Sequence, residues 1–185
     1  MDTIAHRSGV SKTTLYAHFD SKEALFNQVV VDVVSEHGDD AATLLDFPSD
    51  ENLHDRLVTI GCRTLDMLLD PEATALMRLC VIEGARMPRL SYESLTAARE
   101  NLMQRLISFF QENSAPGSTD TGTSERLVID DFRQAADLFV VLTMRDFQLE
   151  AMMPSSAVNS PEAHRRNAER VADLMLRLYG SPAAS

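Results

Sequence analysis

The chain has 185 residues, of which 44% are hydrophobic and 24% are charged, and its formal net charge is −11 at pH 7. These proportions are ordinary for a globular protein, and the length suits either one sizeable domain or a small head on a larger body. No apolar run reaches the roughly 18 residues of a membrane span and no segment resembles a signal peptide, so we expect a cytoplasmic protein that does not bind membranes. Cys62 and Cys80 lie in apolar helical patterns, where buried free thiols are expected.

The acidic charge is unevenly distributed along the chain. Residues 1–23 contain three basic and three acidic residues, whereas residues 24–185 contain 14 basic and 25 acidic residues. The only two lysines, Lys12 and Lys22, both lie in the first segment. An acidic body with a neutral head suits a protein that touches nucleic acid at one end only.

The first nineteen residues, MDTIAHRSGVSKTTLYAHF, predict two short helices joined by a tight turn. Gly9 supplies the positive φ that such a turn needs, and Ala5 is small enough for two helices to cross closely. Val10, Leu15 and Phe19 are expected to fill the wedge between the helices. The pattern is typical of a helix-turn-helix, whose second helix normally lies in the major groove of DNA.

Every later segment with a clear pattern has helical periodicity, so we predict an all-α fold. Ser21 is an N-cap candidate for a long helix that ends near residue 45, and Asp70-Pro71 begins another helix that ends near residue 86. Further helices are predicted over residues 53–68, 95–113, 131–153 and 162–179, with a polar surface loop over 114–124. We divide the chain into a helix-turn-helix head with its connecting helix, residues 1–45, and a ligand-binding and dimerisation body, residues 46–185.

The segment SGVSKTTLYAHFDSKEALF resembles the DNA-binding segment of TetR-type transcriptional regulators. The shared features are a Gly-Val turn, Leu-Tyr-x-x-Phe in the recognition helix, and x-x-Lys-Glu-x-Leu at the start of the next helix. Residues 77–180 resemble, more loosely, the AefR-like type of TetR C-terminal domain through RLCVIEGARMPRL, DDFRQAADLF and the closing Leu-Tyr-Gly. Family members have one more helix before the equivalent of Met1, so the resemblance implies a chain that is short by about one N-terminal helix.

The residue types and the resemblance together indicate which side chains contact DNA. Ser11 is placed to cap the recognition helix, and in the family this end also approaches a phosphate, so both roles stay open. Lysine and threonine in the first turn of a recognition helix can reach base edges, whereas the tyrosine and histidine hold phosphates in the family. Asp2 is expected to face DNA and repel it. The DNA-binding candidates are Ser11, Lys12, Thr13, Thr14, Tyr16, His18 and Lys22.

The body is rich in methionine and aromatic residues, which form either an ordinary core or the lining of a flexible apolar pocket. Arg78 and Arg145 lie within apolar patterns, so each is expected to pair with Glu83, with Asp146 or with a ligand carboxylate. The candidates for an effector pocket are Met67, Met77, Arg78, Met103, Phe109, Phe110, Met144, Arg145 and Phe147.

The last two predicted helices carry wide apolar surfaces, and in the family such helices pair with their copies in a second subunit to form a four-helix bundle. The candidates for this dimer interface are Leu138, Leu142, Leu149, Val171, Met175 and Leu178.

Motifs of catalysis, of cofactor binding and of metal binding are absent: there is no GxSxG, no glycine-rich phosphate loop and no HExxH. We therefore predict a protein that is not an enzyme and needs no cofactor or metal. The sequence favours a homodimeric regulator that binds a double-stranded DNA operator as a repressor and is released by a small apolar or amphipathic effector. The alternative is a dimeric small-molecule-binding or interaction protein that has lost DNA binding together with its first helix.

Overall fold

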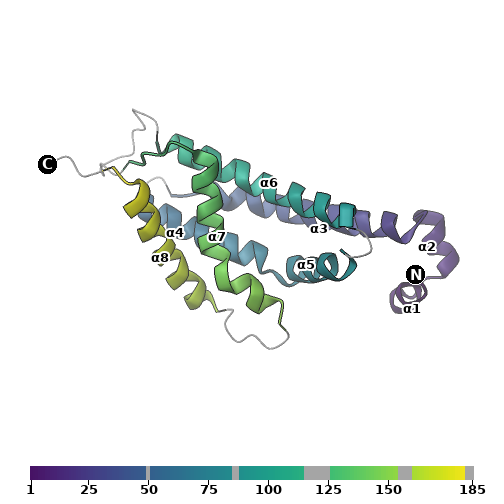
Figure 1. The fold of residues 1–185 in the computed structure, drawn as a ribbon. Coiled ribbons are helices and arrows are strands. Elements are labelled where there is room, and N and C mark those ends of the chain that lie inside the picture. The colour runs from purple at the N-terminus through teal and green to yellow at the C-terminus, as the bar shows by residue number, and fades with distance from the viewer. Residues whose placement is uncertain (49–50, 85–87, 115–125, 154–159, 182–185) are drawn as a thin grey trace.

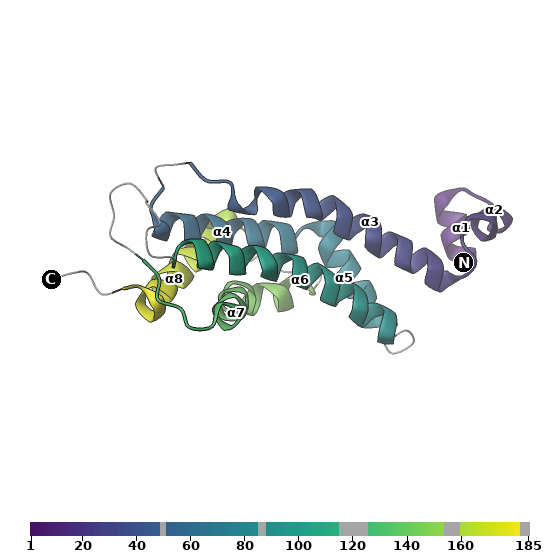
Figure 2. The ribbon, with the colours of Figure 1, turned by 90° about the horizontal axis from the view of Figure 1, so that it is seen from above.

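The computed structural model describes residues 1–48, 51–84, 88–114, 126–153 and 160–181. These residues form eight α-helices, one 3-10 helix (η1, Thr43–Leu45) and no strand, so the predicted all-α fold is confirmed. The molecule is elongated: α1 (Asp2–Ser8) and α2 (Lys12–His18) lie at one end, and α3 (Lys22–Ala42) leads from them along the body (Figures 1 and 2).

The head forms as the sequence predicts, because its local signals agree. Gly9 ends α1 with φ 72° and ψ 11°, the left-handed conformation that glycine adopts without steric cost. Ser11 then caps α2, its hydroxyl accepting a hydrogen bond from the Thr14 backbone N–H at 3.0 Å. Ala5 and Leu15 are the buried side chains of this unit, whereas Val10 is exposed and fills no wedge.

The head is joined to the body through α3, which packs against α5 (Pro71–Glu83). Phe26 and Val30 of α3 form a buried apolar cluster with Cys80 of α5. The start of α5 follows the sequence prediction, since the Asp70 carboxylate accepts a hydrogen bond from the Glu72 backbone N–H at 2.8 Å and Pro71 occupies the first turn. The predicted end of this helix, residues 85–86, lies outside the described residues.

Four helices enclose the main core: α4 (Leu53–Leu68), α6 (Pro88–Glu112), α7 (Phe132–Ala151) and α8 (Pro161–Tyr179). Phe110 stacks edge-on against Phe109 and Phe139, with ring centroids 5.6 and 6.2 Å apart. The helix predicted from residue 95 begins earlier, at Pro88, because proline suits the first turn of a helix. Most of the predicted loop, residues 115–124, lies outside the described residues.

The crossing of α4 and α8 depends on small side chains. A Cβ atom added at Gly61 would lie 2.9 Å from the Ala168 Cβ and 3.3 Å from its Cα. Real Cβ atoms do not approach so closely, so the two helices would have to move apart. We expect Gly61→Ala to lower the free energy of unfolding by about 1 kcal/mol or more, since overpacking outweighs the better helix propensity of alanine.

A double-mutant cycle in urea unfolding checks this prediction. Ala168→Gly removes the methyl group that the new Cβ would meet, so in that background Gly61→Ala should be neutral or stabilising. An equal cost of Gly61→Ala in both backgrounds would show that close approach of α4 and α8 is not its cause.

Helix α7 is kinked at Arg145, whose φ of 5° and ψ of −93° are not helical. The Asn167 side-chain N–H of α8 donates to the Thr143 carbonyl oxygen at 2.9 Å, and this bond is buried. A side chain that bonds to a helix carbonyl is a known cause of kinks. The contact with α8 therefore accounts for the kink.

Candidate functional site

The exposed face of α2 is the first candidate site. Lys12, Thr13 and Tyr16 are exposed on it, as are Ser11, Thr14 and His18. The Ser11 and Thr14 hydroxyls lie 2.7 Å apart and are hydrogen-bonded to each other, so Ser11 has the capping role that the sequence predicts. The side chains of Thr13, Tyr16 and His18 are exposed and make no hydrogen bond to another described residue.

Lys12 does not project freely from this face, because its Nζ atom lies 2.7 Å from the Asp2 carboxylate. The hydrogen bond and charge of Lys12 hold the pKa of Asp2 below its ordinary value, and Asp2 in turn raises the pKa of Lys12. Asp2 was expected to repel DNA directly. The structure shows a second effect, since Asp2 also neutralises one of the few cations of the head.

Lys22 has a partner in the body. Its Nζ atom lies 2.9 Å from the Glu83 Oε1 atom, and the Glu83 side chain is 10% exposed. This ion pair joins the start of α3 to the last residue of α5. The sequence offers Glu83 as one of three possible partners for Arg78 and Arg145, and the structure pairs it with Lys22.

Most of the predicted effector residues belong to the core and not to a pocket. Met103, Phe109, Phe110 and Met144 are buried among apolar side chains. Met67 is partly buried against the same core, so these residues follow the ordinary reading that the sequence left open. Their size and flexibility serve packing here.

Arg78 is exposed and donates to the Ala151 carbonyl oxygen at the end of α7. It is therefore not the buried, carboxylate-paired arginine that the apolar pattern predicted, although it does join α5 to α7. Met77, its neighbour, is half-buried. Neither residue lines the cavity described next.

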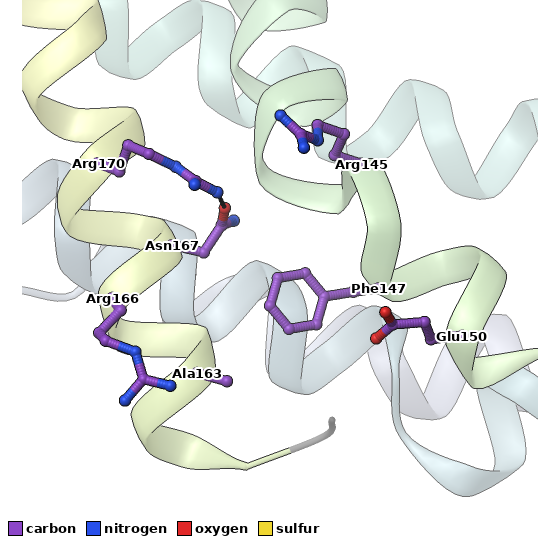
Figure 3. Close-up of a pocket in the computed structure, with 7 residues that line it drawn as sticks. All are labelled: Arg145, Phe147, Glu150, Ala163, Arg166, Asn167 and Arg170. Atoms are coloured by element: carbon purple, nitrogen blue, oxygen red, sulfur yellow. Dashed lines mark hydrogen bonds between the residues drawn. The ribbon is translucent and has the colours of Figure 1, made fainter. Parts of the chain in front are cut away.

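A cavity of about 330 Å³ lies between α7 and α8 (Figure 3). Of the predicted residues it includes Arg145 and Phe147, and its full lining is Arg145, Phe147, Glu150, Ala163, Arg166, Asn167 and Arg170. Figure 3 shows the side chains of Arg145 and Arg170 extending from opposite helices toward the space between them. Arg170 donates to the Asn167 Oδ1 atom at 2.7 Å, which orients its guanidinium.

The residues that α8 contributes to this cavity are not among those predicted from the sequence. A signal was present in HRRNAER, where Arg166 and Arg170 are four residues apart and so share one face of a helix. What the sequence could not show is that this face lies opposite the kink in α7.

The predicted dimer residues divide between the surface and the core. Leu149 is 64% exposed and Leu178 59% exposed, whereas Val171 and Met175 are 1% and 0% exposed within one chain. Val171 and Met175 were therefore wrongly placed at an interface: their face of α8 packs on α4. The exposed apolar residues of α7 and α8 are Val141, Leu149, Leu174 and Leu178.

Two family models match this chain. Residues 1–29 match the model of bacterial regulatory proteins of the tetR family, and residues 55–181 match that of the AefR-like transcriptional repressor C-terminal domain. The chain belongs to the TetR family of transcriptional regulators. Regulators of the TetR family bind DNA and small-molecule effectors, act as dimers and are typically not enzymes. No curated protein sequence matches this regulator.

Solved TetR-family structures share its fold. A structure assigned to the family from Mesorhizobium loti MAFF303099 is 27% identical with a TM-score of 0.75, covering 96% of this chain and 85% of that one. Salmonella enterica GusR is 27% identical with a TM-score of 0.63, covering 96% and 83%. A TetR-family protein from Rhodococcus RHA1, 20% identical with a TM-score of 0.64 over 98% and 86%, shows the fold alone.

None of the described helices is both long and apolar enough to cross a bilayer. Among the same residues, no group of three His, Cys, Asp or Glu side chains could hold a metal ion. Cys80 is buried and Cys62 half-buried, and burial raises the pKa of both thiols.

Proposed function

We propose that this TetR-family regulator is a cytoplasmic homodimeric repressor that reads operator DNA with the exposed face of α2. The observation that carries the proposal is the exposure of Thr13 and Tyr16 on a capped helix at the far end of the molecule (Figure 1). A threonine can contact a base edge through its hydroxyl or its methyl group, and a tyrosine hydroxyl can donate to a phosphate. Lys12, Thr14, His18 and Lys22 complete the proposed DNA surface, with Ser11 at its helix cap.

Residues 1–45 form the DNA-binding part in this proposal, and residues 46–185 bind the effector and the second subunit. The exposed apolar residues of α7 and α8 pair with their copies about a two-fold axis. An effector then acts through its different affinity for two spacings of the recognition helices.

The test is selection of binding sequences from a random pool of double-stranded DNA, followed by fluorescence anisotropy on the enriched duplex. We expect a two-fold symmetric sequence, since each subunit reads one half-site. Tyr16→Ala and Thr13→Ala should each weaken binding by about tenfold or more, because a dimer loses two contacts. Thr96→Ala, at an exposed threonine of α6, should leave affinity unchanged.

Failure to enrich any duplex would favour the alternative, a dimeric ligand-binding or interaction protein. Full affinity of the Thr13→Ala and Tyr16→Ala variants for an enriched duplex would show that another surface reads the DNA.

Asp2→Asn should tighten DNA binding several-fold. The change removes a carboxylate that repels phosphate and frees the Lys12 ammonium from its 2.7 Å ion pair. Each cation that newly neutralises a phosphate also steepens the dependence of log affinity on log salt by about 0.9. Affinities over a salt series check both effects, and Asp20→Asn is the control, since Asp20 is an exposed acidic residue of the same segment. Equal effects of the two variants would indicate a general change in charge and no specific role of the Asp2–Lys12 pair.

A further inference from the structure

The cavity between α7 and α8 has an unusual charge for this protein. Arg145, Arg166 and Arg170 line it, with Glu150 as its one acidic lining residue among those described. The chain as a whole carries a net charge of −11, so a cluster of three guanidinium groups around one cavity contrasts with its acidic composition. Arg166 and Arg170 are four residues apart on α8, a spacing at which like charges repel each other. The Glu162 carboxylate, four residues before Arg166, offsets part of this repulsion, and an anion between the helices would offset more of it.

The cavity also has an apolar wall. The ring of Phe147 extends from α7 toward α8 (Figure 3) and meets the ring of His164 edge-on, with centroids 5.3 Å apart. His164 lies 2.9 Å from the Asp66 carboxylate of α4, so Phe147 is backed by an anchored side chain. A fixed aromatic ring next to guanidinium groups favours a ligand with a flat apolar part and an anionic end.

Asn167 and the kink hold this arrangement in place. Asn167 is buried, donates to the Thr143 carbonyl oxygen and accepts from Arg170. One side chain therefore contacts both the kinked segment of α7 and a guanidinium that lines the cavity. A cavity of about 330 Å³ is at the lower end of the size range of small-molecule sites, which suits a ligand of one or two rings.

We propose that the α7–α8 cavity is the effector site of this regulator and that its ligand is an aromatic carboxylate, held by Arg145 and Arg170 and stacked on Phe147. The role of this ligand as an effector rests on the proposed function. Binding of the carboxylate in the cavity does not depend on it. Arg145 lies four residues along the chain from both Val141 and Leu149, which are exposed apolar residues of the proposed dimer surface. A carboxylate that draws α7 and α8 together would therefore change the relative position of the two helices that form the proposed dimer interface.

The experiment is isothermal titration of the full chain, without DNA, with 2-naphthoate, with its neutral counterpart 2-naphthamide and with inorganic phosphate. We expect 2-naphthoate to bind and 2-naphthamide to bind at least about tenfold more weakly, because the amide lacks the charge that the arginines pair with. Arg145→Gln and Arg170→Gln should each weaken 2-naphthoate binding by about tenfold. Arg165→Gln is the matched control, since Arg165 lies on the same helix, carries the same charge and pairs with Glu169 outside the cavity.

Several results would overturn the assignment. These are equal binding of the acid and the amide, unchanged binding by the Arg145→Gln and Arg170→Gln variants, no binding of 2-naphthoate at millimolar concentration, or phosphate binding alone. Because all three arginines are exposed, thermal melts of the variants should match the parent chain, and the titrations then report on binding. If 2-naphthoate binds but no operator is enriched, the anion site stands and the proposed repressor function fails.

Discussion

Leu178→Glu, combined with Leu149→Glu, should convert the dimer into a monomer at micromolar concentration. Both side chains are exposed within one chain, at 59% and 64%, and both lie on the helices that we propose to pair. An interface of two helices from each subunit buries more than about 1,000 Å². Two glutamates per subunit would remove apolar contact area and bury charge without a partner, which shifts the dissociation constant by at least about a hundredfold. Light scattering measures the mass directly.

The matched control for this variant is Val81→Glu. Val81 is 63% exposed on α5, so the change in charge and exposure is comparable while α7 and α8 stay intact. Deletion of residues 1–19 should also leave the dimer unchanged, since the proposed interface lies wholly in the body. A dimeric Leu149→Glu/Leu178→Glu chain, or a monomeric Val81→Glu chain, would move the interface away from α7 and α8.

Lys22→Ala should lower both stability and DNA affinity, and these two effects have different causes. The carboxylate of Glu83 is mostly buried and would lose the ammonium 2.9 Å away from it, which we expect to cost about 1 kcal/mol, since Lys22 itself is partly exposed. DNA affinity should fall because a cation at the start of α3 can reach a phosphate once it leaves Glu83. The start of α3 would then be held to α5 in the free protein and to DNA in the complex.

The double variant Lys22→Ala/Glu83→Gln separates the two roles. It removes both charges, so urea unfolding should show that much of the lost stability is regained. DNA affinity should stay low, because the phosphate contact is still missing. Glu83→Gln alone should tighten DNA binding several-fold by freeing the ammonium. Recovery of affinity together with stability in the double variant would mean that Lys22 acts only through the α3–α5 contact.

Local interactions determine the structure of the head and the start of most helices, and these interactions can be recognised in the sequence alone. Gly9 at a positive φ, the Ser11 cap and the Asp70-Pro71 start are decided by interactions within four residues, which are readable without knowing the rest of the fold. The start of α8 belongs with them, since Ser160 caps it and Pro161 occupies its first turn. The all-α class follows from the same kind of signal, because helical periodicity repeats along the chain.

The tertiary structure decided which partner each long side chain meets. Arg78 and Glu83 both ended with partners other than those expected, Ala151 and Lys22, because a side chain of this length can reach several neighbours and the helix packing selects among them. The division of α8 into a face toward α4 and a face toward solvent was undecidable from an apolar stripe alone: Val171 and Met175 turned inward, and Leu178 turned outward.

The α7–α8 cavity depends most on the tertiary structure. No proline or glycine marks the kink at Arg145, since its cause is the Asn167 side chain of a different helix. The sequence by itself supplied Arg145, Phe147, Arg166 and Arg170 and the helices that carry them. Only the packing of α8 against α4 and α7 places these residues around one cavity. Contacts between segments far apart in the chain produce no periodic pattern in the sequence of either segment, so this arrangement could not be predicted.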